Sequence, residues 1–293
     1  MQEIHSITKD HFPPFLLPLL EIPEPPEKIY YEGMLPEKEE GVKVLAVVGS
    51  RKHTRYGKDI TQKLLEGLRG YPIIIVSGLA LGIDGIAHQK ALDIGLTTIS
   101  VPGSGIAYKN LYPALHKNLA KEIVKNSGAL VSEFEPELKA APWTFPKRNR
   151  IMAGICDAVL VVEAEEKSGT LITARLALEY NKTVLAVPGN IDSSASKGTN
   201  WLIRQGATPI TQAEDILDAL NIKYQNESEQ QTLPLEDLSP DEILILELLH
   251  EPKSKDVLIR ESKLEASRAL ITLTSLELKD CIKEEMSLYK RIV

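Results

Sequence analysis

Short runs of consecutive apolar residues alternate with longer amphipathic stretches through the middle of the chain. The apolar runs are rich in β-branched residues, as expected of parallel strands that helices cover on both faces. They predict six strands, over Val44–Val48, Ile73–Ser77, Thr97–Val101, Ala129–Ser132, Ala158–Glu163 and Thr183–Val187. The amphipathic stretches predict helices near Gly57–Arg69, Ile83–Ile94, Leu111–Asn126, Arg150–Cys156 and Leu171–Tyr180. Residues 41–222 are therefore expected to form an α/β domain with a Rossmann-like parallel sheet.

Both flanks of this region have a different pattern. Residues 1–40 carry a cluster of prolines between Pro13 and Pro36, and predict a proline-rich N-terminal arm, either an extended arm or a short entry segment. Residues 223–238 are polar, glutamine-rich and aperiodic, which is typical of a linker. Residues 239–293 begin with a helix-start signature at Ser239-Pro240-Asp241-Glu242 and continue with a pattern of three helices and a terminal hairpin. They predict a small C-terminal winged-helix domain.

The cysteine content and the lengths of the apolar runs exclude several classes of protein. The chain has 293 residues and two cysteines, too few for a disulfide framework or a four-ligand zinc site. We therefore expect a cytoplasmic protein with no metal site and no cofactor. The N-terminus lacks the pattern of a signal peptide, and we expect no membrane span because every apolar run is too short for one.

Net charge has to be judged domain by domain. The whole chain has a formal charge of −7, which at face value argues against a nucleic-acid binder. Residues 41–222, however, carry 21 basic and 17 acidic side chains, a net of +4, whereas residues 1–40 have a net charge of −6 and residues 223–293 one of −5. The basic middle permits DNA binding, and the acidic winged helix favours a role in protein interaction or regulation.

The first candidate anion site follows the first predicted strand. Gly49 allows the backbone to approach an anion, Ser50 offers a hydroxyl group, and Arg51 can bind a phosphate in bidentate fashion. The chain has neither a dinucleotide fingerprint nor a P-loop, so these residues do not indicate a nucleotide cofactor. A tight turn with a surface arginine is the alternative.

The second candidate is the segment 142–150, expected in a loop ahead of a helix. Lys147, Arg148 and Arg150 lie within it beside Trp143 and Phe145. Single-stranded nucleic acid is bound by this mixture, because cations pair with phosphates and a ring face stacks on an unpaired base. Helix stability does not explain a basic cluster at a helix N-terminus. The alternative is that the rings pack in the core and the cations are solvated.

Two weaker candidates lie elsewhere in the α/β region. Ser168-Gly169-Thr170 opens a predicted helix and is either a second anion cradle or, as we favour, a plain helix cap. Asp84 and His88 are four residues apart on one helix and are either a proton-transfer or metal pair or, as we favour, a capping carboxylate and a packed histidine. Cys156 is expected to be a small buried residue.

A series of ordered motifs resembles the DNA-processing protein A family (DprA, also called Smf). The resemblance runs from about Leu17 to Ile222, and the C-terminal winged helix is similar to that family's tail. One departure is Leu81, at a position where the family often has a basic residue. The motifs are Val47–Arg51, Ser77–Asp84, Ala87-His88, Tyr112-Pro113, Ser132-Glu133, Phe145–Ile151, Val161–Ala164, Ser168–Ala174 and Val187–Gly189.

The resemblance implies a non-catalytic bacterial protein that binds single-stranded DNA without strong sequence preference. Such a protein works as a homodimer, protects incoming DNA and helps to load the RecA recombinase during natural transformation and homologous recombination. The DNA-binding residues expected from the motifs and the resemblance together are Gly49, Ser50, Arg51, Phe145, Lys147, Arg148, Asn149 and Arg150.

A nucleotide-processing hydrolase is the alternative function. Related Rossmann-like families hydrolyse nucleoside monophosphates and resemble each other in a Pro-Gly-Gly-x-Gly-Thr loop followed by a catalytic glutamate. Here Pro188-Gly189-Asn190 lacks the second glycine, and the corresponding region reads Lys167-Ser168-Gly169-Thr170. We therefore favour the DNA-binding function over the enzyme.

Overall fold

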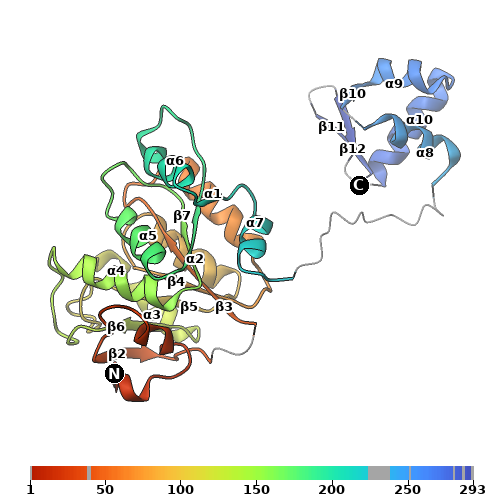
Figure 1. The fold of residues 1–293 in the computed structure, drawn as a ribbon. Coiled ribbons are helices and arrows are strands. Elements are labelled where there is room, and N and C mark those ends of the chain that lie inside the picture. Colours follow the sequence, from red (N-terminus) through yellow and green to blue (C-terminus); the bar gives the residue numbers. More distant parts are fainter. Residues whose placement is uncertain are drawn as a thin grey trace. The chain divides into compact units, whose positions relative to one another are not determined.

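The computed structural model describes residues 2–37, 41–223, 238–250, 252–279, 281–285 and 288–291. The chain divides into two compact units, residues 1–223 and residues 224–293 (Figure 1). Most of the expected linker, positions 224–237, lies outside the described residues.

The first unit is built on one sheet, with strand order β1-β2-β6-β5-β4-β3-β7-β8-β9 in the described residues. The strands from β3 to β9 pair in parallel, whereas β2 pairs antiparallel with β6 and with β1 at one edge. The Rossmann-like parallel sheet is therefore confirmed, with a mixed edge. Its strands are β1 (His5–Thr8), β2 (Lys28–Gly33), β3 (Lys43–Val48), β4 (Ile73–Ser77), β5 (Thr98–Ser100), β6 (Ala129–Ser132), β7 (Ala158–Val161), β8 (Thr183–Ala186) and β9 (Thr208–Pro209).

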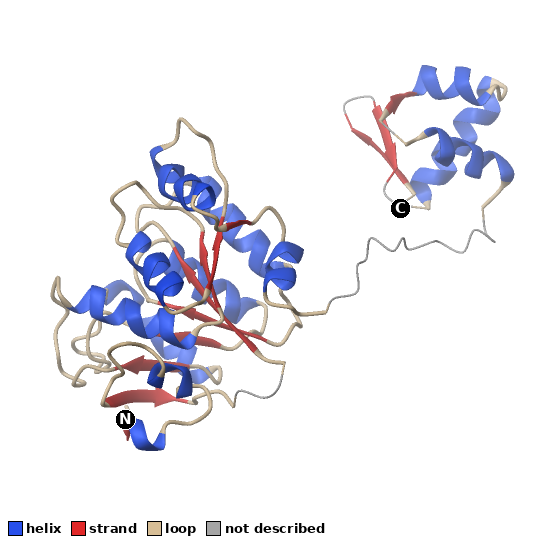
Figure 2. Ribbon diagram, viewed as in Figure 1, coloured by secondary structure: helices blue, strands red, loops and turns tan. Residues whose placement is uncertain are grey.

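Helices cover both faces of this sheet (Figure 2). Helices α1 and α2 pack together on one face, and α4 and α5 pack together on the other. The α-helices are α1 (Arg55–Glu66), α2 (Ile83–Asp93), α3 (Lys117–Lys125), α4 (Thr144–Ile155), α5 (Thr170–Glu179), α6 (Lys197–Arg204) and α7 (Ala213–Ala219). Short 3-10 turns cover η1 (Lys9–His11), η2 (Leu17–Leu20), η3 (Ala114–His116) and η4 (Ser194–Ser196).

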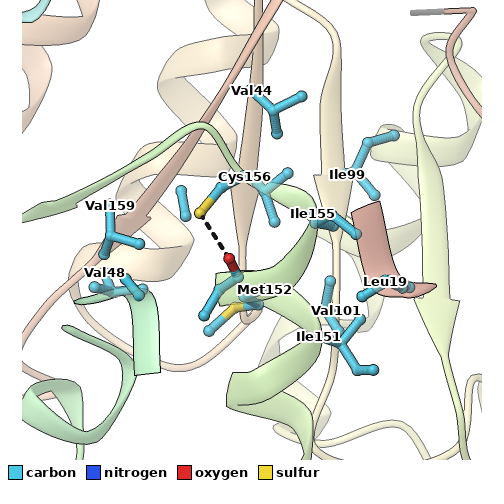
Figure 3. Close-up of a cluster of buried hydrophobic side chains, with 14 of the residues drawn as sticks. Leu19, Val44, Val48, Ile99, Val101, Ile151, Met152, Ile155, Cys156 and Val159 are labelled. Atoms are coloured by element: carbon cyan, nitrogen blue, oxygen red, sulfur yellow. Dashed lines mark hydrogen bonds between the residues drawn. The ribbon is translucent and has the colours of Figure 1, made fainter. Parts of the chain in front are cut away.

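The main core lies between the sheet and helices α4 and α5. Alternate residues of β3, such as Val44 and Val48, point into it and are buried together with Ile151 and Ile155 of α4 (Figure 3). Cys156 is fully buried in the same cluster, where its Sγ lies 3.4 Å from the carbonyl oxygen of Ala153. The prediction of a small buried residue at Cys156 is confirmed.

The proline-rich N-terminal segment is not an extended arm in the structure. It forms β1 and β2 at the sheet edge, and η2 packs against α4. Phe15, Leu16 and Leu19 are fully buried in the main core, so the prolines separate short elements that apolar side chains anchor. Gly154 of α4 allows this close packing, because a Cβ there would lie 2.8 Å from the Leu19 side chain.

The second unit has the predicted winged-helix arrangement. Three helices pack around a small core, and a three-stranded sheet in the order β10-β12-β11 completes the unit. Ser239 and Glu242 form the expected capping box at the start of the first helix. The elements are α8 (Pro240–Leu248), β10 (Lys253–Ser254), α9 (Lys255–Ser262), α10 (Ala266–Leu278), β11 (Ile282–Glu285) and β12 (Leu288–Arg291).

Truncation of Phe15 tests whether the N-terminal segment is part of the fold. Phe15→Ala should lower the free energy of unfolding by about 3–5 kcal/mol, because it removes a fully buried ring from the main core. Leu17→Ala, at a side chain that is 47% exposed, should change it by less than about 0.5 kcal/mol. Urea denaturation measures both values, and an unchanged midpoint for Phe15→Ala would show that the segment does not stabilise the fold.

Candidate nucleic-acid interface

The candidate interface lies at the point where the strand order reverses. Strand β3 is paired with β4 on one side and with β7 on the other; the chain passes from β3 to β4 on one side and from β7 to β8 on the other. In open α/β sheets the crevice beyond the carboxyl ends of such strands is the usual ligand site. A cleft of about 570 Å³ occupies this position, and we call it the switch-point cleft. Its wall includes the turn after β3 and the first turns of α4 and α5.

The turn after β3 packs tightly against the start of α2. A Cβ on Gly49 would lie 2.6 Å from the Ile83 side chain, so this position needs glycine. The backbone N–H of Ile83 donates to the carbonyl oxygen of Ser50 at 3.2 Å, and the Ser50 hydroxyl accepts from the N–H of Lys52 at 3.1 Å. These contacts hold the turn that carries Arg51, an exposed residue, at the cleft.

Arg51 is held by a ring and not by a carboxylate. Its guanidinium carbon lies 4.8 Å from the centre of the Phe145 ring, a cation–π contact. It forms no ion pair with any residue that the structure describes. The Arg51 guanidinium therefore lines the cleft without a direct ion pair, although the carboxylates of Asp84 and Glu165 also lie in the cleft wall and Arg51 acts on Asp84 through space.

Aromatic rings extend the cleft on the Arg51 side. The Phe145 ring packs edge-on against Tyr112, with centroids 5.9 Å apart. Tyr112 and Leu81 are partly exposed, and with Arg51 and Phe145 they line a shallow hollow beside the cleft. Sequence reasoning did not place Tyr112 or Leu81 at the site, although both lie in the family motifs. The hollow presents apolar surface next to a cation.

The expectation that residues 142–150 form a loop is wrong, because α4 begins at Thr144. Helical spacing then points neighbouring cations in different directions. Arg148 is only 5% exposed, and its Nη1 donates to the carbonyl oxygens of Gly78 and Val101 at 2.6 Å each. A Cβ on Gly78 would lie 1.8 Å from this guanidinium, so a side chain there would displace Arg148 from its two carbonyl partners. Burial lowers the pKa of Arg148 to about 10, against the opposing effect of Asp84.

The cations after Phe145 do not all reach the cleft. Arg148 and Asn149 line it, and Arg148 Nε donates to Asn149 Oδ1 at 3.0 Å. Arg150 is buried away from it, in an ion pair with Glu133 and a hydrogen bond to the carbonyl oxygen of Glu24. Lys147 is exposed but is not part of the cleft wall. The structure thus brings six of the eight expected residues together, namely Gly49, Ser50, Arg51, Phe145, Arg148 and Asn149.

The N-terminus of α5 forms the opposite wall. Ser168, Gly169 and Thr170 line the cleft there, and the Thr170 hydroxyl donates to the carbonyl oxygen of Gly49 at 3.1 Å. The Ser168 hydroxyl accepts the N–H of Thr170, the first residue of α5, at 3.2 Å, and the N–H groups of Leu171 and Ile172 donate to the carbonyl oxygens of Ser168 and Gly169. The preferred interpretation of these residues as a helix cap agrees with the Ser168 contact, and the positive end of the α5 dipole lies at the cleft wall together with Arg51.

Comparison with known proteins identifies the family. The sequence profile described as DNA recombination-mediator protein A matches residues 3–221, and the DprA winged helix domain matches residues 229–285. The chain belongs to the DNA recombination-mediator protein A (DprA/Smf) family. The expected resemblance is thereby confirmed.

Individual members of the DprA family are similar over most of the first unit. Protein Smf of Escherichia coli is 46% identical over 60% of this chain, and the match covers 46% of that protein, less than half of its length. The X-ray structure of DprA from Streptococcus pneumoniae has 35% identity and a TM-score of 0.67, and the match covers 76% of each chain. The structure of DNA processing protein A from Helicobacter pylori has 28% identity and a TM-score of 0.64, over 75% of this chain and 98% of that one.

Asp84 and His88, which belong to the DprA motifs, have separate structural roles. Asp84 is buried and accepts the N–H groups of Gly78 at 3.2 Å and Ala80 at 3.3 Å, and burial raises its pKa. His88 is fully buried, and its Nδ1 lies 2.7 Å from the Thr98 hydroxyl. Burial lowers the pKa of His88 to about 3. The packed-histidine interpretation is confirmed, and the described residues contain no cluster of acidic, His or Cys side chains suited to a metal ion.

In the winged helix of this DprA-family chain, two cations at α10 pair with acids. Arg268 of α10 pairs with Asp241, and Lys279, directly after α10, lies 2.8 Å from the carboxylate of the buried residue Glu242. Hydrogen bonds from Lys279, Ser239 and Ser275 overcome burial and lower the pKa of Glu242 to about 2.

Among the described helices of the whole chain, none combines the length and apolar character needed to span a bilayer.

His88 should make the stability of the protein sensitive to acid. The folded chain keeps His88 neutral down to about pH 3, whereas an unfolded chain protonates it below about 6.5, so acid favours unfolding in this window. From about pH 8 to about pH 5 this effect should cost about 2 kcal/mol. Urea denaturation of His88→Gln should show a pH dependence smaller by this amount, and the exposed control His53→Gln should keep that of the wild type. Equal pH dependence in His88→Gln and the wild type would contradict this assignment.

Proposed function

We propose that this chain is a non-catalytic recombination mediator that binds single-stranded DNA in the switch-point cleft. The observation that carries the proposal is Arg51, a cation without a direct ion pair among the described residues that stacks on Phe145 and faces the N-terminus of α5. A phosphate between these groups would meet a bidentate donor and the positive end of the α5 helix dipole. Gly49, Ser50, Arg148 and Asn149 also line the switch-point cleft.

Base stacking supplies the second part of the proposed site. Tyr112 and Phe145 present ring surface beside Arg51, and an unpaired base can stack on such a ring whatever its identity. Contacts to phosphates and ring faces give binding without strong sequence preference. Lys147, exposed on the first turns of α4, serves in this proposal as an outer phosphate contact. Arg150 is left out because its charge is neutralised by Glu133.

Relatives support this chemistry. The similar structure from Helicobacter pylori is described as revealing a unique single-stranded DNA binding mode of DNA processing protein A. By family resemblance we extend the proposal to a homodimer that protects incoming single strands in the cytoplasm and helps to load RecA. We assign the DNA contact to the first unit, because two cations at α10 in the winged helix are paired with carboxylates.

The hydrolase alternative lacks an available general acid or base in the residues considered for it. Glu163 accepts hydrogen bonds from both the N–H and the hydroxyl of Thr54, where it holds the start of α1. Asp84 is occupied by the two N–H groups of the turn after β4. Release of free base from nucleoside monophosphates, abolished by Glu163→Gln, would nevertheless establish the enzyme.

Neutralising Arg51 tests the proposed site. Arg51→Gln should weaken binding of oligo-dT about fivefold or more and lower the slope of log affinity against log salt by about 0.7, because one phosphate contact is lost. Fluorescence anisotropy across a salt series measures both quantities. The control is Arg69→Gln, a cation at the far end of α1 that pairs with Glu66. If Arg51→Gln binds with wild-type affinity and slope, the site assignment fails.

A further inference from the structure

A second groove lies on the other side of the first turn of α5. It has a volume of about 710 Å³ and runs between α5, the loop after β8 and helix α6, and we call it the α5–α6 groove. Asn200 fixes this loop, because its side chain exchanges hydrogen bonds with the backbone N–H and carbonyl of Gly189 at 3.2 and 3.0 Å. Tyr56 ties the same loop to α1 by donating to the carbonyl oxygen of Pro188 at 2.9 Å. These hydrogen bonds hold the loop that forms one wall of the α5–α6 groove in a defined position.

Cations and apolar side chains line the α5–α6 groove. Arg175, Lys197 and Arg204 are exposed in its wall, and none has an ion pair within the part of the chain that the structure describes. Glu166 is the one acidic residue of the described wall. This concentration of unpaired positive charge is suited to a polyanion.

An exposed tryptophan lies among these cations. The Trp201 side chain is 40% exposed on α6, on the wall of the groove that Arg204 and Lys197 also form. The combination of an indole ring with several cations is the one that binds single-stranded nucleic acid, because the ring stacks on a base while the cations pair with phosphates. A purely apolar partner would leave the three cations desolvated and unpaired.

One segment of the chain separates the switch-point cleft from the α5–α6 groove and lines both. The segment from Glu165 to Thr173 contributes Ser168 and Thr170 to the switch-point cleft, and Glu166 and Leu171 to the α5–α6 groove. The carbonyl oxygen of Ala164 accepts the N–H of Gly198 at 2.8 Å, which fastens α6 to the base of this segment. A chain leaving the first cleft over the α5 N-terminus thus enters the second directly.

From this continuity we infer that the α5–α6 groove is a second stretch of the single-stranded DNA path. The inference rests on the proposed function of the switch-point cleft. In this path Arg51 and the α5 N-terminus hold one phosphate region, Arg175 and Arg204 hold the next, and a base stacks on Trp201. A strand too short to cross α5 occupies the first cleft alone.

Binding of oligonucleotides of two lengths distinguishes the switch-point cleft from the α5–α6 groove. The probes are oligo-dT of about 5 and about 15 nucleotides, within the range that single-strand binding modules cover. Arg175→Gln/Arg204→Gln should weaken binding of the longer probe about fivefold or more and lower its salt slope by about 1.4, and should leave binding of the shorter probe unchanged. The matched control is Lys63→Gln/Lys125→Gln, which removes two exposed cations outside both clefts.

Fluorescence gives a second readout that does not depend on a loss of stability. Trp143 and Trp201 are the two tryptophans of the chain, so Trp143→Phe leaves Trp201 as the single indole reporter. The longer probe should quench its emission, and the shorter probe should not, because only the longer strand reaches the groove.

The outcomes distinguish the two proposals. If Arg51→Gln weakens both probes while Arg175→Gln/Arg204→Gln weakens neither, the second stretch is wrong and the first site stands. If Arg51→Gln affects neither probe, the proposed function of the first cleft fails as well. If the double variant binds both probes normally but loses self-association in sedimentation, the groove is a surface between copies of this chain and the DNA path is overturned.

Discussion

The candidate interface depends on the burial of one guanidinium group. Arg148 donates to the carbonyl oxygens that follow β4 and β5, and so ties α4 to the carboxyl edge of the sheet. A buried charge is stable only where its donors are satisfied, because an unpaired charged group carries a large desolvation penalty. The Arg148 side chain occupies the space that a side chain at Gly78 would fill, so sheet and helix constrain each other at this point.

This anchor determines what faces the cleft. Phe145 lies three positions before Arg148 and so on the same side of α4, where its ring supports Arg51. The neighbouring acids Glu163 and Asp84 are occupied by Thr54 and by the turn after β4. Arg148 therefore serves to hold α4 against the sheet, whereas Arg51 remains available for a ligand. Both are candidate phosphate-binding residues in the sequence.

Much of the fold could be predicted from the pattern of apolar residues. The strands from β3 to β8 were expected because they are buried on both faces and read as continuous β-branched runs. Strands β1 and β2 were not expected, since their stability comes from pairing with β6 and from Phe15 and Leu19, which are distant in the sequence from their partners. Helix α4 begins earlier than the sequence pattern predicts, because Pro146 indicates a loop although a proline is tolerated in the first turn of a helix.

The site could be predicted in part. The turn 49–51 is formed by residues adjacent in the sequence and directly follows a predicted strand. Its position at the carboxyl end of that strand therefore predicts that it lies at the cleft. The direction of each cation in 147–150 depends on helical phase and on carbonyls more than forty residues away in the sequence, which no local pattern reveals. For this reason the sequence predicts Arg150 to be a phosphate-binding residue. In the structure it pairs with the carboxylate of Glu133 and donates to the carbonyl oxygen of Glu24.

Photo-crosslinking tests the central claim most directly. Oligo-dT that carries photoreactive bases would be irradiated with the full chain, and the linked peptides mapped by mass spectrometry. The account predicts crosslinks in the peptides that contain Tyr112 and Phe145, reduced by Arg51→Gln. Crosslinks confined to the winged-helix unit, with none in the peptides around the switch-point cleft, would contradict it.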